Sequence, residues 1–298
     1  MTTPLYSTSM ALRFVHCSDI HLLDLRGTSP WRFLNKRMTG AVNLALKRRK
    51  RHDGRIFDAI VASAAKLAAD RLVVTGDVTN LALQSEFELV RRKFSASPVP
   101  VTVIPGNHDA YTRGSARSGR FAEYLGEFMA GERVDDSEFP FVQRFGDVAL
   151  VGCSSAVPSL PLYATGRLGD AQLARLDKTL ARLADQTCVR VVLVHHPVVD
   201  GVSHERHDLL DIAAFQRVIQ ARGAELILHG HEHRKLVGSL PGPTGRVPVH
   251  GISSGTSVVP SVGKRAAFAV YDVDGADIGR RLFVWNGADF DETEPTAA

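Results

Sequence analysis

Residues 225–233 read ELILHGHEH, an apolar run that ends at Gly230 and is followed by two histidines two positions apart. The short apolar run predicts a buried strand. Side chains at positions i and i+2 of an extended segment point the same way, so we expect His231 and His233 to face one point beyond the strand. Such a pair either binds a metal ion or hydrogen-bonds to backbone carbonyls, and the pair alone does not decide between these interpretations.

Four other apolar runs predict strands, and each ends in side chains that commonly bind metals. These runs, with the side chains that follow them, are 12–18 with Asp19 and His21, 72–75 with Asp77, 101–104 with Asn107 and His108, and 191–194 with His195 and His196. Ligands of an open α/β sheet collect beyond the carboxyl ends of its strands, so we expect the five groups to meet. Of the two adjacent histidines, one is expected to face the site and the other to pack.

The most specific motif is the turn at residues 105–109, which reads PGNHD. Proline, glycine and asparagine are common in turns, each for a conformational reason. His108 and Asp109 have no such reason to be there, which indicates a functional role for both.

The combined donor set contains oxygen and nitrogen ligands and no thiolate. Such a set suits Mn, Fe, Zn or Co rather than a structural zinc site built from cysteines. It also offers more ligands than one tetrahedral ion uses, so it predicts two ions bridged by a carboxylate. Two ions about 3.5–4 Å apart can hold the attacking and leaving oxygens of an in-line displacement.

The remaining pattern predicts an α/β protein with a single domain. Apolar residues at helical spacing separate the predicted strands at residues 54–69, 85–94, 170–184 and 212–221. After residue 233, alternating segments with a hairpin signal at Asp274-Gly275 predict a second sheet. We expect the domain to cover residues 11–286, with a flexible extension at 1–10 and an acidic tail at 287–298.

Composition limits the classes of protein to consider. Of the 298 residues, 44% are hydrophobic and 23% charged, and the net charge of +4 is modest, as in soluble globular proteins. No apolar run reaches membrane-spanning length, and residues 1–10 lack the pattern of a secretory signal. The cysteines Cys17, Cys153 and Cys188 show no disulfide-framework spacing. These features predict a cytoplasmic protein, at most peripheral to the inner membrane surface.

Residues 24–52 interrupt the alternation of strands and helices. They combine the basic run Lys47–Arg51 with apolar residues such as Trp31 and Phe33 at helical spacing, which predicts a basic helical insertion, or cap, beside the site. The insertion is either a solvated helical face or a surface, at residues 31–51, that attracts anionic lipid headgroups or a large polyanionic substrate.

Taken in order, the motifs resemble those of the calcineurin-like metallophosphoesterase family over about residues 12–285. The matching residues are Asp19-x-His21, Gly76-Asp77, Gly106-Asn107-His108-Asp109, His195 and Gly230-His231-x-His233. The resemblance implies a four-layer α-β-β-α metallophosphoesterase sandwich, with the basic helical insertion after the first strand and a binuclear metal centre at one edge.

The resemblance also implies how the ligands are shared between two metal ions. Asp77 would bridge the ions, the first would be held by Asp19, His21 and His233, and the second by Asn107, His195 and His231. His195 is preferred to His196 because the first histidine of the family's His-x-Pro arrangement is the ligand.

By the same likeness, a hydroxide that bridges the two ions attacks phosphorus in line. His108 would donate a proton to the leaving oxygen or stabilise its charge, and Asp109 would orient His108. We also expect Asn80 and Arg113 to contact the substrate.

The leading hypothesis for the substrate is a phosphodiester. Residues 166–173 look like a segment common in class III cyclic-nucleotide phosphodiesterases. Residues 81–82 and 110–111 depart from the pattern of those enzymes, which argues against a small cyclic substrate.

Three alternatives remain. A lipid-linked nucleotide pyrophosphatase or phosphatase at the membrane surface would use the basic insertion as a cap, as in the UDP-2,3-diacylglucosamine pyrophosphatases, although those enzymes commonly carry arginine in place of His108. A non-catalytic scaffold of the same fold would typically have lost ligands, and none is missing here. A nuclease has only the positive charge in its favour, so no nucleic-acid partner is expected. The sequence does not predict the oligomeric state or the native metal pair.

Overall fold

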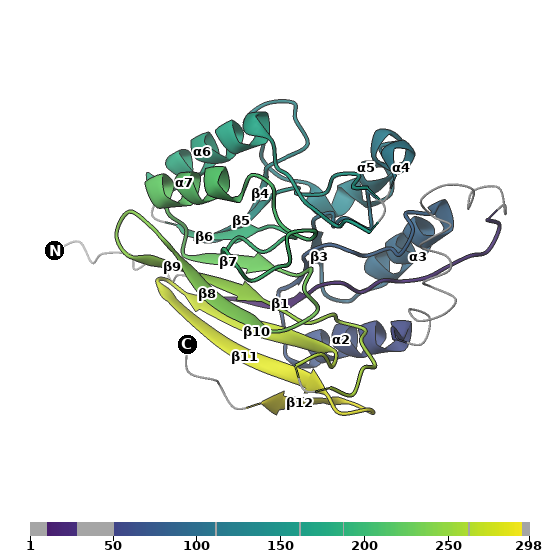
Figure 1. The fold of residues 1–298 in the computed structure, drawn as a ribbon. Helices are drawn as coiled ribbons and strands as arrows, with labels where there is room; N and C mark the ends of the chain where they lie inside the picture. The colour runs from purple at the N-terminus through teal and green to yellow at the C-terminus, as the bar shows by residue number, and fades with distance from the viewer. Residues whose placement is uncertain are drawn as a thin grey trace.

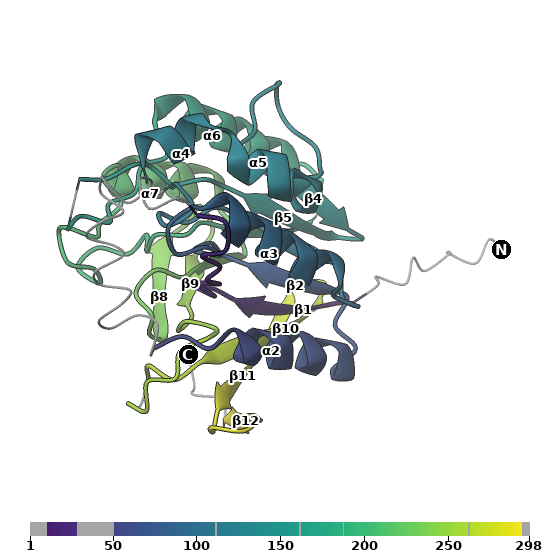
Figure 2. The ribbon, with the colours of Figure 1, turned by 90° about the vertical axis from the view of Figure 1, so that its right-hand side faces the viewer.

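The computed structural model describes residues 11–28, 51–110, 112–160, 162–186, 188–261 and 263–293 of the chain. Two six-stranded sheets lie at its centre, and helices cover their outer sides (Figures 1 and 2). The predicted two-sheet α/β sandwich is therefore confirmed. The predicted extension at residues 1–10 and most of the basic insertion, residues 29–50, lie outside the described residues.

The first sheet combines strands from both ends of the chain in the order β12-β11-β10-β1-β2-β3. β1, β2 and β3 run parallel to one another, and β10 pairs antiparallel with β1. The strands are β1 (Leu12–Cys17), β2 (Arg71–Val74), β3 (Val101–Val103), β10 (Ala267–Asp274), β11 (Asp277–Trp285) and β12 (Phe290–Thr293).

The second sheet has the order β4-β5-β6-β7-β9-β8, and its four inner strands are parallel. The strands are β4 (Phe141–Phe145), β5 (Val148–Gly152), β6 (Val189–Leu193), β7 (Leu226–His229), β8 (Leu236–Pro241) and β9 (Arg246–Gly251).

The helices are α2 (Gly54–Lys66), α3 (Gln84–Ser95), α4 (Arg113–Arg117), α5 (Arg120–Leu125), the 3-10 turn η3 (Gly126–Met129), α6 (Asp170–Ala184) and α7 (Ile212–Arg222). Helices α2, α3, α6 and α7 connect neighbouring parallel strands, which need crossover connections, and the other helices lie between β3 and β4. None of the helices in the described part of the chain has both the length and the apolar character needed to cross a bilayer.

Alternation of side chains along β5–β7 divides the interior into two cores. Leu150, Val191 and Leu228 belong to the core that also includes the first sheet. Val192 and Ile227, which point the other way, belong to the core beneath α6 and α7. Strands buried on both faces read as continuous apolar runs, which explains why these segments were recognisable in the sequence.

The C-terminal part of the chain differs from prediction in two respects. The strands after residue 233 do not form a sheet of their own, because β8 and β9 extend the second sheet while β10–β12 extend the first. Residues 290–293 form β12 against β11, so the sheet continues past the predicted domain boundary at 286, and the segment 287–293 is not a loose tail.

Glu86 is a buried carboxyl group at the start of α3. Its Oε2 accepts hydrogen bonds from the backbone N–H groups of Leu81 and Leu83, each at 3.0 Å. Burial raises the pKa of Glu86 from 4.5 to about 8, despite these bonds. The carboxyl group is therefore neutral in the folded protein near pH 7, and it fixes the loop that follows Asn80.

We predict that Glu86→Gln changes how stability depends on pH. Because the folded-state pKa of Glu86 is raised, its contribution to the free energy of unfolding is fully present below about pH 4.5 and is lost as the pH rises through about 8. Glutamine cannot ionise, so the variant should gain on the order of 4 kcal/mol over the wild type between pH 5 and pH 8.5. Urea unfolding at both pH values measures this gain. The exposed Glu123→Gln control should show the same pH dependence of the free energy of unfolding as the wild type. If Glu86→Gln also showed the wild-type pH dependence, Glu86 would not be neutral in the folded protein.

Candidate metal centre

Five loops that follow strands carry the polar side chains predicted from the sequence. Asp19 and His21 follow β1, Asp77 follows β2, and Asn107 follows β3, all in the first sheet. The other three histidines come from the second sheet, with His195 after β6 and His231 and His233 after β7. Asp19 and His195 have no solvent exposure. Contacts between the two sets, described below, bring the ends of the two sheets together at one edge of the sandwich.

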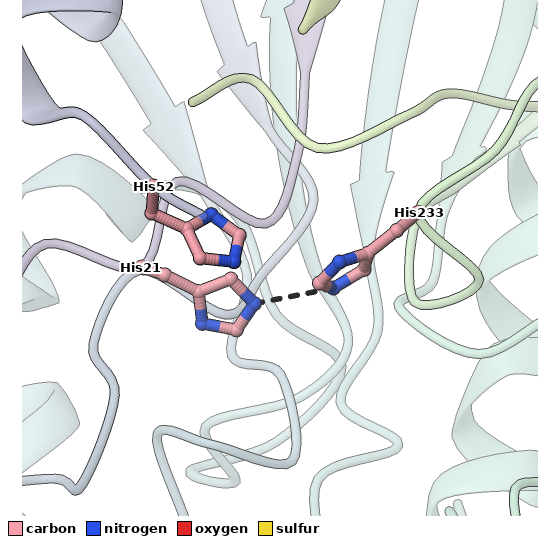
Figure 3. Close-up of side chains that lie close together, drawn as sticks. All are labelled: His21, His52 and His233. Carbon is pink, nitrogen blue, oxygen red and sulfur yellow. Dashed lines mark hydrogen bonds between the residues drawn. The ribbon is translucent and has the colours of Figure 1, made fainter. Parts of the chain in front are cut away.

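The first cluster of donors joins Asp19, His21, Asp77 and His233, whose ligand atoms all lie within 4.8 Å of one another. Nε2 of His21 is 3.2 Å from Nε2 of His233 (Figure 3). Nε2 of His233 is also 3.2 Å from Oδ1 of Asp19, and Nε2 of His21 is 3.8 Å from Oδ2 of Asp77.

The second cluster joins Asn107, His195 and His231. Oδ1 of Asn107 lies 3.1 Å from Nε2 of His195 and 3.0 Å from Nδ1 of His231, and these two nitrogens are 3.3 Å apart. Oδ1 of Asp77 is 3.5 Å from Nε2 of His195. Asp77 therefore turns one carboxylate oxygen to each cluster.

Backbone carbonyls decide which nitrogen of three histidines faces the clusters. His21 Nδ1 contacts the Thr79 carbonyl at 3.3 Å, His195 Nδ1 contacts the Thr75 carbonyl at 2.7 Å, and His231 Nε2 contacts a carbonyl at 3.1 Å. A carbonyl only accepts, so each of these nitrogens carries the proton. The other nitrogen of each ring then presents its lone pair to the cluster, as in histidines that bind metals.

The adjacent His196 does not join the clusters. Its Nδ1 bonds to the hydroxyl of Ser155 at 2.7 Å and its Nε2 to the Ala164 carbonyl at 3.1 Å. Both ring nitrogens of His196 are thus used in hydrogen bonds away from the clusters. Of the two neighbouring histidines, His195 is the one that faces the site.

Burial and neighbouring charges shift the pKa values of several donor residues in the centre. Burial, with the nearby carboxylates of Asp19 and Asp109, raises the pKa of Asp77 well above its usual value. Burial, the largest single effect, would also raise the pKa of Asp19, but His233, His195 and the hydrogen bond from Ser18 together outweigh it, so the net shift is downward. Burial lowers the pKa of His231, which favours its neutral form.

The donor atoms fit divalent cations. Over the described ranges, Asp19 and Asp77 form ion pairs with histidines and not with lysine or arginine. Oδ1 of Asp19 is buried and has no hydrogen bond among those residues. Converging oxygen and imidazole donors of this kind suit transition-metal ions, and two clusters that share Asp77 suit a pair of them.

The backbone of the centre is strained at its donor residues. Non-glycine residues with positive φ are uncommon, yet φ is 53° at Asp19, 41° at His21, 52° at Asp77, 74° at His231 and 50° at His233. Such residues cost about 1–3 kcal/mol each and gather at functional sites.

Glycines allow the donor loops to approach one another. An added Cβ at Gly106 would overlap Oδ1 and the backbone nitrogen of Asp77, and one at Gly230 would overlap the side chains of Ser18 and Asp19. At Gly76, where φ is +97°, a Cβ would lie 2.7 Å from Nδ1 of His195. The glycines of the sequence motifs therefore serve packing between loops.

His108 lies beside the first cluster. Its ring centroid is 5.0 Å from that of His21, with the planes nearly perpendicular. Nδ1 of His108 donates to the carbonyl of Asn80 at 2.6 Å, and the backbone N–H of His108 donates to Oδ1 of Asp77 at 2.7 Å. These two contacts fix the ring relative to the bridging carboxylate.

Asp109 does not orient His108 as the sequence suggested. Its carboxylate accepts from the backbone N–H groups of Gly106 at 2.9 Å, Thr79 at 2.9 Å and Val78 at 3.3 Å. Asp109 thus joins the loop after β3 to the loop after β2, and Asn80, through its carbonyl, is the group that orients His108.

Asn80 and Arg113 were expected to contact substrate. Asn80 is only 2% exposed, and its side-chain amide donates to the His21 carbonyl. Asn80 therefore holds the backbone of the site and presents no accessible group to a substrate. The side chain of Arg113 lies outside the described residues.

His52 is a site residue that the sequence analysis missed. Its ring centroid is 4.7 Å from that of His21 and 5.8 Å from that of His233 (Figure 3). His52 stands at the end of the basic insertion and does not follow a strand, so a pattern of donors at strand ends does not predict it.

Comparison with known proteins shows what this chain is similar to. A family model described as calcineurin-like phosphoesterase matches residues 12–235. The probable glycerophosphodiester phosphodiesterase GpdQ of Arcobacter nitrofigilis is 26% identical over 170 residues, which cover 55% of this chain and 57% of that protein. The glycerophosphodiester phosphodiesterase GpdQ of Enterobacter lignolyticus is 29% identical over 135 residues, covering 43% and 42%. The chain spans about half the length of these curated relatives.

A solved structure resembles the whole chain. A dimetal phosphatase from Danio rerio superposes with a TM-score of 0.55, at 15% identity, over 94% of this chain and 98% of that one. At this level of identity the likeness is one of fold.

We predict that Gly106→Ala weakens metal binding by moving Asp77. The new Cβ would displace Asp77, the residue that both clusters share. A misplaced supporting group typically costs 10- to 100-fold in metal affinity, so a loss of about this size should appear in titrations with Mn. Gly126→Ala is the matched control, since a Cβ there has no neighbour within 4 Å. Wild-type affinity in Gly106→Ala would show that Asp77 does not hold metal.

Proposed function

The chain belongs to the calcineurin-like phosphoesterase family, and from this premise we propose that it is a binuclear metal-dependent phosphoester hydrolase whose substrate is a phosphodiester. The observation that carries the proposal is the position of Asp77, with one oxygen toward His21 and the other toward His195. A single carboxylate between two clusters of donors is what a two-metal hydrolase requires.

In this proposal the ligands divide as the two clusters do. Asp77 contributes to both sites, with Asp19, His21 and His233 in the first and Asn107, His195 and His231 in the second. When bound, two cations lower the pKa of water and neutralise charge on the phosphoryl oxygens.

The chain's own contribution to the reaction comes from His108. With Nδ1 donating to Asn80, the Nε2 of His108 is the nitrogen that can gain a proton and pass it to the leaving oxygen. Asp109 has a positioning role. Its carboxylate joins the loops after β2 and β3, and this fixes Asp77, Asn107 and His108 relative to one another.

A phosphodiester is favoured over a monoester by the relatives. Both curated proteins are named glycerophosphodiester phosphodiesterases. Complete donor clusters favour an enzyme over a non-catalytic scaffold of the same fold, because a scaffold has no use for the strained backbone at five donor residues.

A specific surface feature favours a lipid-linked substrate as the second candidate. Leu160, Leu162 and Leu210, here called the apolar rim, are 68%, 79% and 62% exposed. Their loops are joined by backbone hydrogen bonds and border the second cluster, where His231 contacts the His207 carbonyl at 3.1 Å. An exposed apolar patch beside a site suits a lipid chain or a membrane surface.

We predict that His108→Ala binds two metal ions but loses most turnover. Removal of one group that stabilises the transition state costs about 10²- to 10³-fold in kcat, and the substitution removes no ligand of either cluster. Hydrolysis of bis-p-nitrophenyl phosphate with Mn, beside metal analysis, measures both properties.

Asp77→Ala serves as the comparison in that experiment, because it should lose the metal ions and the activity together. Unchanged turnover in His108→Ala would remove His108 from the mechanism, and a wild type inactive with each of several metals would favour the scaffold.

The second candidate makes its own prediction for the basic insertion. Neutralising Lys47–Arg51 should weaken co-sedimentation with anionic phospholipid vesicles at least about 10-fold, since each basic residue near such a surface contributes about 1 kcal/mol. The control replaces exposed basic residues elsewhere, at Lys66, Lys178, Arg217, Arg246 and Lys264. Equal sedimentation of the two variants and the wild type would end the proposal of a membrane surface at residues 31–51.

A further inference from the structure

We propose that His52 is a further protein ligand of the first metal ion and gives that site a third imidazole. The inference rests on the proposed metal centre and goes beyond it by assigning a donor that none of the strand ends supplies. His21, His52 and His233 each offer a ligand atom within 4.8 Å of the other two. Figure 3 shows the ring nitrogen of His52 remote from the main chain turned toward the space between His21 and His233.

The backbone around His52 is anchored to the folded domain. Asp53 N–H donates to the Thr256 carbonyl at 2.9 Å, and the Arg51 carbonyl accepts from Val258 at 2.9 Å. His52 itself forms an antiparallel bridge with Ser257. Its position is therefore set by the segment 256–258 and by α2, which begins at Gly54.

Two hydroxyl groups determine the tautomer of His52. The Thr256 hydroxyl donates to the Ile20 carbonyl at 2.9 Å, so its oxygen is left to accept from Nδ1 of His52 at 3.0 Å. Ser254, whose hydroxyl donates to the Asp19 carbonyl at 2.6 Å, lies 3.4 Å from the same nitrogen. With the proton on Nδ1, the lone pair of the neutral ring is on Nε2, the nitrogen turned toward the cluster.

This arrangement repeats the pattern of two other donor histidines, His21 and His195. In His21 and His195, as in His52, Nδ1 is held by an oxygen acceptor and Nε2 faces the donors. Thr256 and Ser254 also hold the backbone of Ile20 and Asp19, in the loop that carries two donors of the first cluster. His52 is therefore fixed to that loop, and an outer hydrogen bond that orients the ring is typical of a metal-binding histidine.

The consequence is an asymmetric centre. The first site would have three imidazoles, from His21, His52 and His233, whereas the second would have two imidazoles, one amide and the shared carboxylate. An added neutral imidazole favours metals late in the first-row series. We expect the first site to keep its ion when a chelator has emptied the second.

Metal binding to His52→Ala and His52→Gln in the full chain tests the proposal. The probes are Co, followed by its visible absorption, and Zn in competition with a chelator. Because loss of an outer hydrogen-bond partner already costs 10- to 100-fold in affinity, loss of His52 should weaken the first ion at least about 10-fold and alter the Co spectrum. Added imidazole should restore the spectrum of His52→Ala. Circular dichroism verifies folding of each variant, and exposed His204→Gln is the matched control.

The outcomes separate this inference from the proposed function. Wild-type affinity and an unchanged Co spectrum in both His52 variants would overturn the assignment while leaving the two-metal hydrolase intact. Unchanged metal binding with a raised KM would assign His52 to the substrate instead, and would also overturn it. A wild type that binds neither Co nor Zn would contradict the proposed function and the inference together.

Discussion

The centre depends on a concentration of lone pairs and negative charge that the described part of the chain does not neutralise. The Nε2 atoms of His21 and His233 face each other at 3.2 Å, and Asp77 is buried near two other carboxylates, which raises its pKa. Buried carboxylates this close to one another repel at low local dielectric. Two cations would relieve this repulsion with the donors in place, so the closeness of these carboxylates is itself the strongest sign of what the site binds.

Contacts with the rest of the fold hold the donor residues in backbone conformations that are unfavourable by themselves. Five donor residues have positive φ, and contacts between loops keep them there: Asp19 N–H donates to the Gly76 carbonyl and His21 N–H to the Asp77 carbonyl. Asp109 ties the loop after β2 to the loop after β3. Strain of this kind persists only where the surroundings over-determine the backbone, and the two sheets provide that support from opposite sides of the site.

The sequence predicted the donors that follow strands, because a buried strand, a glycine and a polar side chain are local signals. It could not predict what depends on distant partners. Asp109 was assigned to His108, its sequence neighbour, but its carboxylate reaches Val78 and Thr79, about thirty residues away. His52 is oriented by Thr256, 204 residues away. Likewise, the alternation of apolar and polar residues after residue 233 indicated strands. It could not show that β10–β12 return to the first sheet, because periodicity carries no information about which strands pair.

Anomalous diffraction from crystals soaked in Mn tests the central claim most directly. The account predicts two peaks about 3.5–4 Å apart, one on each side of the Asp77 carboxylate, with the first bordered by His21 and His233 and the second by His195 and His231. A single peak, or peaks that do not share Asp77, would contradict it.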